Sequence, residues 1–211
     1  MGGAFARTMT DSTRPLTALA LVCTLKPSPA ESSSQLLARQ LLDELATHDV
    51  TGTAVRLADY DIKPGVQVDE GDGDQWPHIR EQILASDILV IVTPTWLGHL
   101  SSVAQRALER LDAELSETDD DGRPKVEGKV AIVGVVGNED GAHAIIADVF
   151  QALNDVGFSI PSQGSTYWNG EAMGSVDYKD LDETPEAVAG QNATVANNAA
   201  HLARLRADQP Y

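Results

Sequence analysis

The sequence predicts an α/β fold in which helices cover both faces of a doubly wound parallel sheet. Two runs, 87–93 and 129–136, consist mostly of Val, Ile and Leu without polar alternation, which is typical of parallel strands buried on both faces. Segments with helical periodicity separate the apolar runs along the chain. Because parallel crossovers are nearly always right-handed, this alternation favours one sheet between two layers of helices.

The expected strands follow one another with room for a helix between neighbours. In chain order they cover 17–23, 53–57, 87–93, 129–136 and 158–163. The expected helices cover 75–85, 101–115, 142–156 and 34–46, the last with Leu37, Leu41 and Leu45 on one face. Thr184 and Pro185 are residue types of a helix start, so a final amphipathic helix is expected after them.

The chain of 211 residues is long enough for one domain with a sizeable core. We expect that domain over residues 16–206, a mobile tail over 1–15 and a short tail over 207–211. Cys23 is the only cysteine, so no intrachain disulfide can form and a cytoplasmic location is expected. The apolar run 16–23 is at the short limit of an export signal, and Val22 is too large for a processing site, so no leader is expected.

The charge of the chain argues against two classes of partner. There are 32 acidic and 15 basic residues, which give a net charge of −17, and such a surface repels nucleic acids and anionic lipids. No stretch approaches the roughly 20 apolar residues of a membrane span. The acidic runs 69–74 and 119–121 are expected to be solvated loops. We therefore expect small-molecule partners, and no metal site is predicted.

The loop after the first strand is rich in hydroxyl groups and contains no glycine. Residues 24–34 include five Ser or Thr side chains and Lys26 just before a helix start, where free amides and the helix dipole favour an anion. Dinucleotide and nucleoside-triphosphate loops need glycine so that the backbone can approach phosphates. A terminal monophosphate fits this loop better. The alternative is that Ser32 to Ser34 only cap the helix.

Two other doubly wound classes are excluded at the strand ends. A low-molecular-weight phosphatase would need Arg six residues after Cys23, where this chain has Pro29. A receiver domain would need acidic residues at the ends of the first and third strands, but the third strand is followed by Pro94 and Thr95. Cys23 is therefore expected to be a small buried strand residue and not a nucleophile.

A second motif follows the third strand. The residues Thr93-Pro94-Thr95-Trp96-Leu97-Gly98-His99-Leu100-Ser101-Ser102 resemble the second flavin loop of the NADPH-dependent FMN reductase and NAD(P)H:quinone reductase families, in which Pro, an aromatic residue and a Gly-containing turn precede a helix. The resemblance covers roughly residues 17–170. It implies a flavodoxin-like fold whose five parallel strands have the order 2-1-3-4-5.

The resemblance also implies that three loops hold FMN without a covalent bond. The phosphate would be held by Thr24, Lys26, Ser32, Ser33 and Ser34. The isoalloxazine would be lined by Pro94, Thr95, Trp96, Leu97 and Gly98, whose backbone amides would reach the polar edge of the ring. The pyrimidine end would meet Gly137, Asn138, Gly141 and His143. A flavin ring needs a flat wall and a few fixed donors, and Trp96 can supply a wall, although it could instead be a core or dimer-interface residue.

This chain departs from the family pattern at several positions. Lys26 stands where the family usually has Arg, and Lys is a point charge without a planar fork. We expect Glu139 and Asp140 to point away from the ring, because a carboxylate at its N1 would oppose anionic reduced flavin. His99 and His143 could contact flavin or substrate, or be loop histidines without chemistry. The stretch 164–171, with Tyr167 and Trp168, could close over the flavin or contact a partner subunit.

The function implied by the resemblance is an FMN-dependent oxidoreductase. NAD(P)H would pass a hydride to flavin N5, and a quinone, free flavin or similar small acceptor would then be reduced. No catalytic side chain is expected, because the cofactor carries the chemistry, and a homodimer or homotetramer is expected. The alternative is a flavodoxin-type one-electron carrier, which the negative charge favours because such carriers dock on basic partners. A flavin-free interaction domain is a third possibility.

Overall fold

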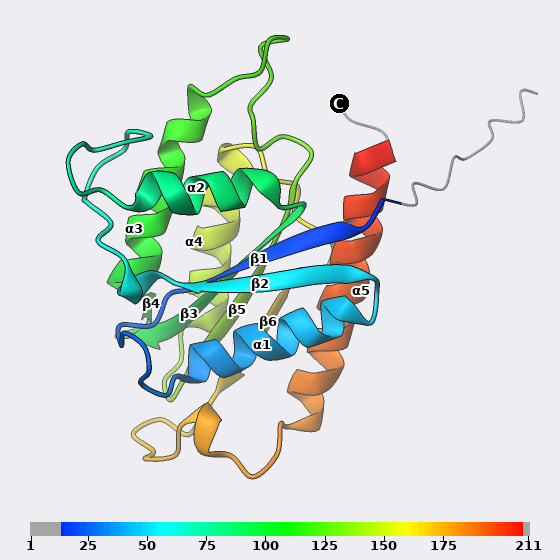
Figure 1. Ribbon diagram of the computed structural model, residues 1–211. Coiled ribbons are helices and arrows are strands. Elements are labelled where there is room, and N and C mark those ends of the chain that lie inside the picture. The colour runs from blue at the N-terminus through cyan, green and yellow to red at the C-terminus, as the bar shows by residue number, and fades with distance from the viewer. Residues whose placement is uncertain (1–13, 209–211) are drawn as a thin grey trace, which may run out of the picture.

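The computed structural model describes residues 14–208, and five parallel strands form its central sheet (Figure 1). They are β1 (Leu16–Val22), β2 (Val50–Arg56), β3 (Ile88–Trp96), β5 (Val130–Gly137) and β6 (Ser165–Asn169), in the order β2-β1-β3-β5-β6. The two-residue strand β4 (His99–Leu100) pairs antiparallel with the end of β3. Counted over the parallel strands alone, this is the predicted order 2-1-3-4-5, so the fold prediction is confirmed.

Helices cover both faces of the sheet. One face carries α1 (Ser33–Ala46) and α5 (Glu186–Asp208), and the other carries α2 (Trp76–Ala85), α3 (Ser102–Leu111) and α4 (Ala142–Asp155) (Figure 1). Short 3-10 helices cover Leu57–Asp59 (η1), Asp112–Leu115 (η2) and Tyr178–Asp180 (η3). Alternate strand residues enter different cores: Leu21 packs with α2 to α4, whereas Val22 packs with α1 and α5. The central strands are apolar without interruption because each of their two faces contributes to a different hydrophobic core.

The last strand lies farther along the chain than the sequence indicates. The predicted strand 158–163 makes one isolated bridge, between Ser159 and Val130, and regular pairing begins only at Ser165. Pro161 has no amide hydrogen to donate to a ladder, and Gln163 has a φ of 50°, so the chain leaves the extended conformation between these points. The prediction of a strand over 158–163 is therefore wrong, because its apolar character reflects the burial of Phe158 in the core.

The connection between β2 and α2 is held by a buried ion pair. The carboxylate of Asp74 lies 2.8 Å from the guanidinium of Arg110 on α3, and both side chains are inaccessible to solvent. Arg110 also donates to backbone carbonyls of the connection, among them that of Gln67. Burial alone would raise the pKa of Asp74, but hydrogen bonds from Arg110 and from backbone amides outweigh it and hold that pKa below its usual range. The expectation of a solvated loop over 69–74 is wrong for Asp74.

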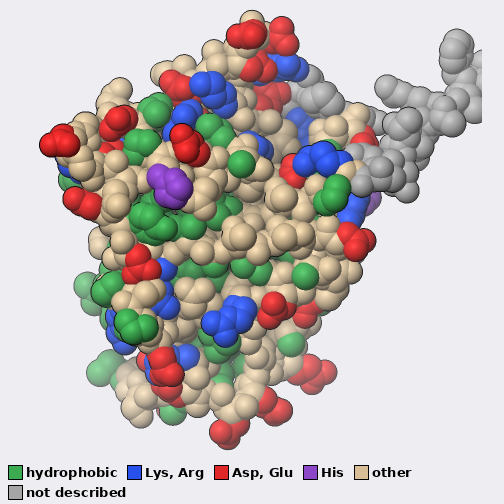
Figure 2. Space-filling view, viewed as in Figure 1, with side chains coloured by type: hydrophobic (Ala, Val, Ile, Leu, Met, Phe, Trp, Pro, Cys, Tyr) green, Lys and Arg blue, Asp and Glu red, His purple; other side chains and the backbone are tan. Residues whose placement is uncertain are grey.

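The surface carries the acidic character of the sequence. Acidic side chains lie over several elements and at the edges of the face drawn in Figure 2, with fewer basic ones between them. Among residues 14–208, no helix is both long and apolar enough to cross a membrane. The predicted mobile tail over 1–15 and the tail over 207–211 fall largely outside the described residues.

Candidate functional site

A cavity of about 470 Å³ opens at the carboxyl ends of β1, β3, β5 and β6. The strand order reverses between β1 and β3, because the chain first moves outward from β1 to β2 and then returns to the other side of β1. Ligands of open parallel sheets bind at such a reversal point. The volume also lies within the range of small-molecule sites. The sheet therefore places a ligand-sized space where its topology predicts one.

Most of the predicted site residues line this cavity. They are Thr24, Lys26, Ser32, Ser33 and Ser34 from the first loop, Pro94, Thr95, Trp96 and Leu97 from the second, and Gly137 and Asn138 from the third. The three loops are far apart in sequence, and the parallel order of β1, β3 and β5 brings their ends to the same edge. The structure thus brings the three predicted loops together around one space.

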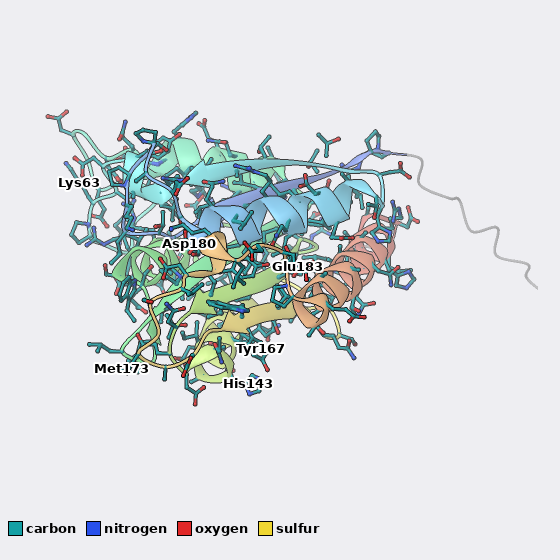
Figure 3. All side chains as sticks on the ribbon, turned by 90° about the horizontal axis from the view of Figure 1, so that it is seen from below. Lys63, His143, Tyr167, Met173, Asp180 and Glu183 are labelled. Atoms are coloured by element: carbon teal, nitrogen blue, oxygen red, sulfur yellow. The ribbon has the colours of Figure 1, made fainter. Side chains whose placement is uncertain are left out.

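Gly98, Gly141 and His143 are not among the lining residues. Gly141 has a φ of 138°, and a Cβ added there would lie 2.6 Å from the carbonyl oxygen of Gly98, so the two glycines let the second and third loops touch. His143 is exposed, and its ring meets that of Tyr167 edge-on at 5.1 Å between centroids, beside α4 and β6 (Figure 3). His99 is exposed on β4 and does not line the cavity either.

One end of the cavity carries hydroxyl groups and two cations. Ser32 is the N-cap of α1, and its Oγ accepts a hydrogen bond of 3.3 Å from the amide of Gln35. Ser32 therefore caps the helix, and its own hydroxyl hydrogen is not used in that bond. Lys179 of η3 lines the same end as Lys26, and its amide donates to Ser33 Oγ at 3.3 Å. A hydrogen bond to Asp180 raises the pKa of Lys179, which keeps this side chain charged.

Apolar and aromatic side chains also line the cavity. They are Pro94, Trp96, Leu97 and Val136, together with Trp168 of β6. The Trp96 side chain is 52% exposed at the mouth, so it is not a core residue. Trp168 packs against Tyr178 with 5.4 Å between ring centroids. These aromatic surfaces suit a planar hydrophobic ligand.

Two buried polar atoms of the lining residues lack a hydrogen-bond partner. Thr95 Oγ1 and Asn138 Oδ1 are inaccessible to solvent, and neither has a partner among the described residues. Each such atom costs about 1–3 kcal/mol when left unsatisfied in a protein interior. Both belong to residues that line the cavity. A ligand in the cavity can satisfy them once these side chains change rotamer.

The third loop differs from the expectation at Glu139. Its carboxylate accepts hydrogen bonds from the amides of Leu97 at 2.9 Å and Gly98 at 3.2 Å, and the residue lines the cavity. The prediction that Glu139 points away from the site is therefore wrong, because two free amides of the neighbouring loop attract its charge. The same bonds occupy two of the amides that the sequence analysis assigns to the ring edge. Asp140 is exposed and accepts from the amide of Gly141 at 2.7 Å.

Residues after β6 form a wall that the sequence analysis missed. Met173, Gly174, Asp177, Tyr178 and Lys179 line the cavity from this segment. Figure 3 shows Met173 at the periphery of the molecule. The Tyr178 hydroxyl donates to Gln40 Oε1 of α1 at 2.6 Å, and Asn138 Nδ2 donates to Asp177 Oδ1 at 3.1 Å. The segment has no helical or strand periodicity, and only its aromatic and basic side chains before a helix start hint at a site.

Cys23 lies outside the cavity. It is buried at the end of β1, and burial raises the pKa of its thiol. A protonated, inaccessible thiol is not a nucleophile. The expectation that Cys23 is a structural residue is confirmed.

Comparison with known proteins decides the family. The profile of the family described as NADPH-dependent FMN reductase matches residues 17–172, a span that contains all three loops. The chain belongs to this family. The chain thus belongs to a flavoprotein family of flavodoxin-like fold whose cofactor is FMN and whose reductant is NADPH.

Two curated proteins are similar to this family member in sequence. The 8-demethyl-8-aminoriboflavin-5'-phosphate synthase of Streptomyces davaonensis is 31% identical over 208 residues, which cover 93% of this chain and 80% of that protein. The divalent metal cation transporter MntH of Mycobacterium bovis is 35% identical over 169 residues. The match covers 78% of this chain but only 25% of that protein.

Solved structures agree with the assignment. The crystal structure of RosB with bound intermediate 8-demethyl-8-formylriboflavin-5'-phosphate has a TM-score of 0.84 and 31% identity, and the match covers 93% of this chain and 82% of that one. A flavodoxin from the domain Archaea has a TM-score of 0.58 at 5% identity, with coverage of 89% and 99%. The second likeness shows the fold alone.

Proposed function

We propose that this flavin reductase binds FMN in the cavity at the β1/β3 reversal and passes reducing equivalents from NAD(P)H to a quinone, a free flavin or a similar small acceptor. The observation that carries the proposal is the mixed lining of the cavity: hydroxyl groups and lysines lie at the start of α1, and aromatic side chains lie on β3 and β6. A ligand with a phosphate at one end and a planar ring at the other matches this arrangement.

Each end of the cavity has a distinct role in the proposal. Ser32, Ser33, Ser34, Thr24 and Lys26 would hold the phosphate at the positive end of the α1 dipole, with Lys179 as a second cation. Trp96 and Trp168 would enclose the ring and exclude water, and Thr95 Oγ1 and Asn138 Oδ1 would pair with its polar edge. Bound FMN supplies the electron-accepting chemistry, so the side chains need only bind and orient it.

Steady-state oxidation of NAD(P)H by the FMN-loaded protein tests this function. Quinones, free flavins and ferricyanide are offered as separate acceptors under anaerobic conditions. We expect oxidation that depends on both FMN and an acceptor. No oxidation above that of free FMN with any acceptor would contradict the proposal. The electron-carrier alternative would instead show a stable one-electron stage in a redox titration and no direct reduction by NAD(P)H.

A second candidate is an enzyme that modifies the flavin itself. The similarity to an aminoriboflavin phosphate synthase over 93% of the chain favours this candidate. In that case riboflavin phosphate would be a substrate and would leave the site chemically altered. The two functions are separated by the mass of the flavin recovered after turnover with NAD(P)H and with amine donors. An unchanged mass favours the reductase, and a new flavin product favours the modifying enzyme.

The oligomeric state and location belong to the same proposal. Apolar side chains surround the cavity mouth, with Leu97 88% exposed and Met173 fully exposed, and surfaces of this kind commonly mark interfaces. A homodimer or homotetramer that covers the mouth is therefore proposed, and light scattering on the purified protein tests it. A cytoplasmic location stays a prediction from the single cysteine.

A further inference from the structure

The turn between β3 and β4 holds two adjacent amides without a partner in the sheet. Trp96 pairs with His99, and the two residues between them, Leu97 and Gly98, have φ values of 52° and 76°. Positive φ at both central positions is the requirement of a type I′ hairpin turn. In the left-handed region a Leu is unusual, and its side chain is exposed and gains no burial. An interaction outside the turn must therefore favour this conformation.

That interaction comes from Glu139. Its two carboxylate oxygens accept separately from the amides of Leu97 and Gly98, at 2.9 and 3.2 Å. Charge-assisted bonds of this kind are stronger than neutral ones. They fix the turn that presents Trp96 at the mouth of the cavity. Among residues 14–208, no Lys, Arg or His forms a salt bridge with Glu139.

The other charges of the cavity lie elsewhere and are largely compensated. Lys26, Lys179 and the carboxylate of Glu31 stand near the start of α1, where Lys179 meets Asp180 at 2.6 Å and also lies in the field of Glu31. Asp177 accepts from Asn138 and lies 4.0 Å from Lys179. Glu139 is thus the lining carboxylate that bonds to the turn directly after Trp96, where two amide dipoles offset its charge.

We propose that Glu139 is a positioning residue that also lowers the reduction potential of bound flavin. The inference rests on the proposed function, in which the ring lies at the aromatic end. With FMN bound, hydride transfer from NAD(P)H would bring two electrons and one proton to the ring and leave NAD(P)⁺, so the ring would carry one more negative charge until it took a proton from solvent. A fixed carboxylate beside the ring opposes that charge. Reduced flavin is therefore held less tightly, relative to oxidised flavin, than it would be without Glu139.

The test compares three FMN-loaded proteins: the wild type, Glu139→Gln and Asp140→Asn. Both substitutions remove one negative charge from the same loop, but the Asp140 carboxylate is exposed and bonds only to the adjacent amide of Gly141. The dissociation constants of oxidised and reduced FMN and the two-electron midpoint potential are measured for each. Chemical unfolding of each protein verifies that the variants fold.

We expect Glu139→Gln to raise the affinity for reduced relative to oxidised FMN about tenfold, which corresponds to a rise of about 30 mV for a two-electron couple. Asp140→Asn should leave both quantities unchanged. Equal shifts in the two variants, or no shift in either, would overturn the inference while FMN binding by the wild type persisted. Failure of the wild type to bind FMN would instead overturn the proposed function, and this inference with it.

Discussion

At the scale of single residues, Lys26 is a predicted phosphate-binding side chain that the structure places in the lining of the cavity. It precedes the serines of the first loop in the sequence, and it lines the hydroxyl-rich end of the cavity in the structure. In the proposal its ammonium group binds the phosphate of FMN, and the ring lies against the aromatic side chains. Lys26 should therefore distinguish FMN from riboflavin.

We predict that Lys26→Met weakens FMN binding about tenfold to a hundredfold, the loss expected for one charge-assisted hydrogen bond. Riboflavin, which lacks the phosphate, should bind the variant and the wild type equally. Fluorescence titration with both ligands measures this. Lys125→Met is the control, because Lys125 pairs with Glu117 and does not line the cavity. An equal loss of affinity for both ligands would show that Lys26 acts on the fold and not on the phosphate.

Asp74 makes the stability of the protein depend on pH. Its pKa is lowered in the folded state by Arg110 and backbone amides, so its contribution is present above the unfolded pKa of about 3.9 and is lost as the pH falls toward the folded pKa. Asp74→Asn should lower the free energy of unfolding at pH 7 by about 3–5 kcal/mol, because Arg110 is left buried without its partner.

Urea unfolding at pH 7 and pH 3 measures both effects. The wild type should lose more stability than Asp74→Asn between these two values, since the variant has no carboxylate to protonate at that position. Asp120→Asn, which changes an exposed residue of another loop, should behave like the wild type. If the wild type and Asp74→Asn lose equal amounts of stability between pH 7 and pH 3, the buried ion pair is not a source of the pH dependence.

At the scale of elements, contact between the second and third loops depends on Gly141. Its φ of 138° disfavours any side chain, and a Cβ would also collide with the Gly98 carbonyl oxygen. Gly71 has a positive φ of 89° but nothing within 4 Å of an added Cβ. The two glycines therefore separate the cost of an unfavourable φ from the cost of pushing the loops apart.

We predict that Gly141→Ala lowers the free energy of unfolding by about 1–3 kcal/mol more than Gly71→Ala does, because overpacking adds to backbone strain. FMN affinity should fall in Gly141→Ala alone, since only there does the turn bearing Trp96 move. Urea unfolding and FMN titration of both variants provide the comparison. Matching effects in the two variants would mean that the contact between the loops has no influence on the site.

The segment after β6 is fixed to α1 through Tyr178. Removal of its hydroxyl in Tyr178→Phe leaves Gln40 Oε1 without this donor, and such bonds contribute about 1 kcal/mol. We expect faster hydrogen exchange of amides in residues 170–184 and faster release of FMN. Tyr60→Phe is the matched control, because Tyr60 packs on the core of α2 to α4 outside the cavity. Unchanged hydrogen exchange in Tyr178→Phe would show that this hydrogen bond does not fix the segment to α1.

The elements also show where sequence patterns suffice. The continuous apolar runs of β3 and β5 identify buried parallel strands, because burial on both faces leaves no polar alternation. The edge strand β6 has no such run, since only Thr166 of its five residues is fully buried. Phe158 and Ile160 are more apolar than the residues of β6, so the sequence pattern places the strand several residues too early. Pro161, which breaks the ladder, was the available indication that the strand begins later.

At the scale of the whole molecule, the sheet topology explains why the site was partly predictable. The loops after β1, β3 and β5 could be named in advance, because strand ends of a parallel sheet converge at one edge. The wall that follows β6 could not be predicted. Its approach to α1 depends on tertiary contacts such as that of Tyr178 with Gln40. The position of Glu139 could not be predicted either, because it follows from the turn geometry at Leu97 and Gly98.

The central claim is that the cavity binds FMN in an orientation set by its two unlike ends. The most direct measurement is titration of the purified protein with FMN, followed by anaerobic addition of NAD(P)H while the visible absorption and tryptophan fluorescence are recorded. The account predicts binding of one FMN per chain, a shifted flavin spectrum, quenching that is smaller in Trp96→Phe, and loss of the visible flavin band on addition of NAD(P)H. A flavin spectrum identical to that of free FMN, without quenching, would contradict it.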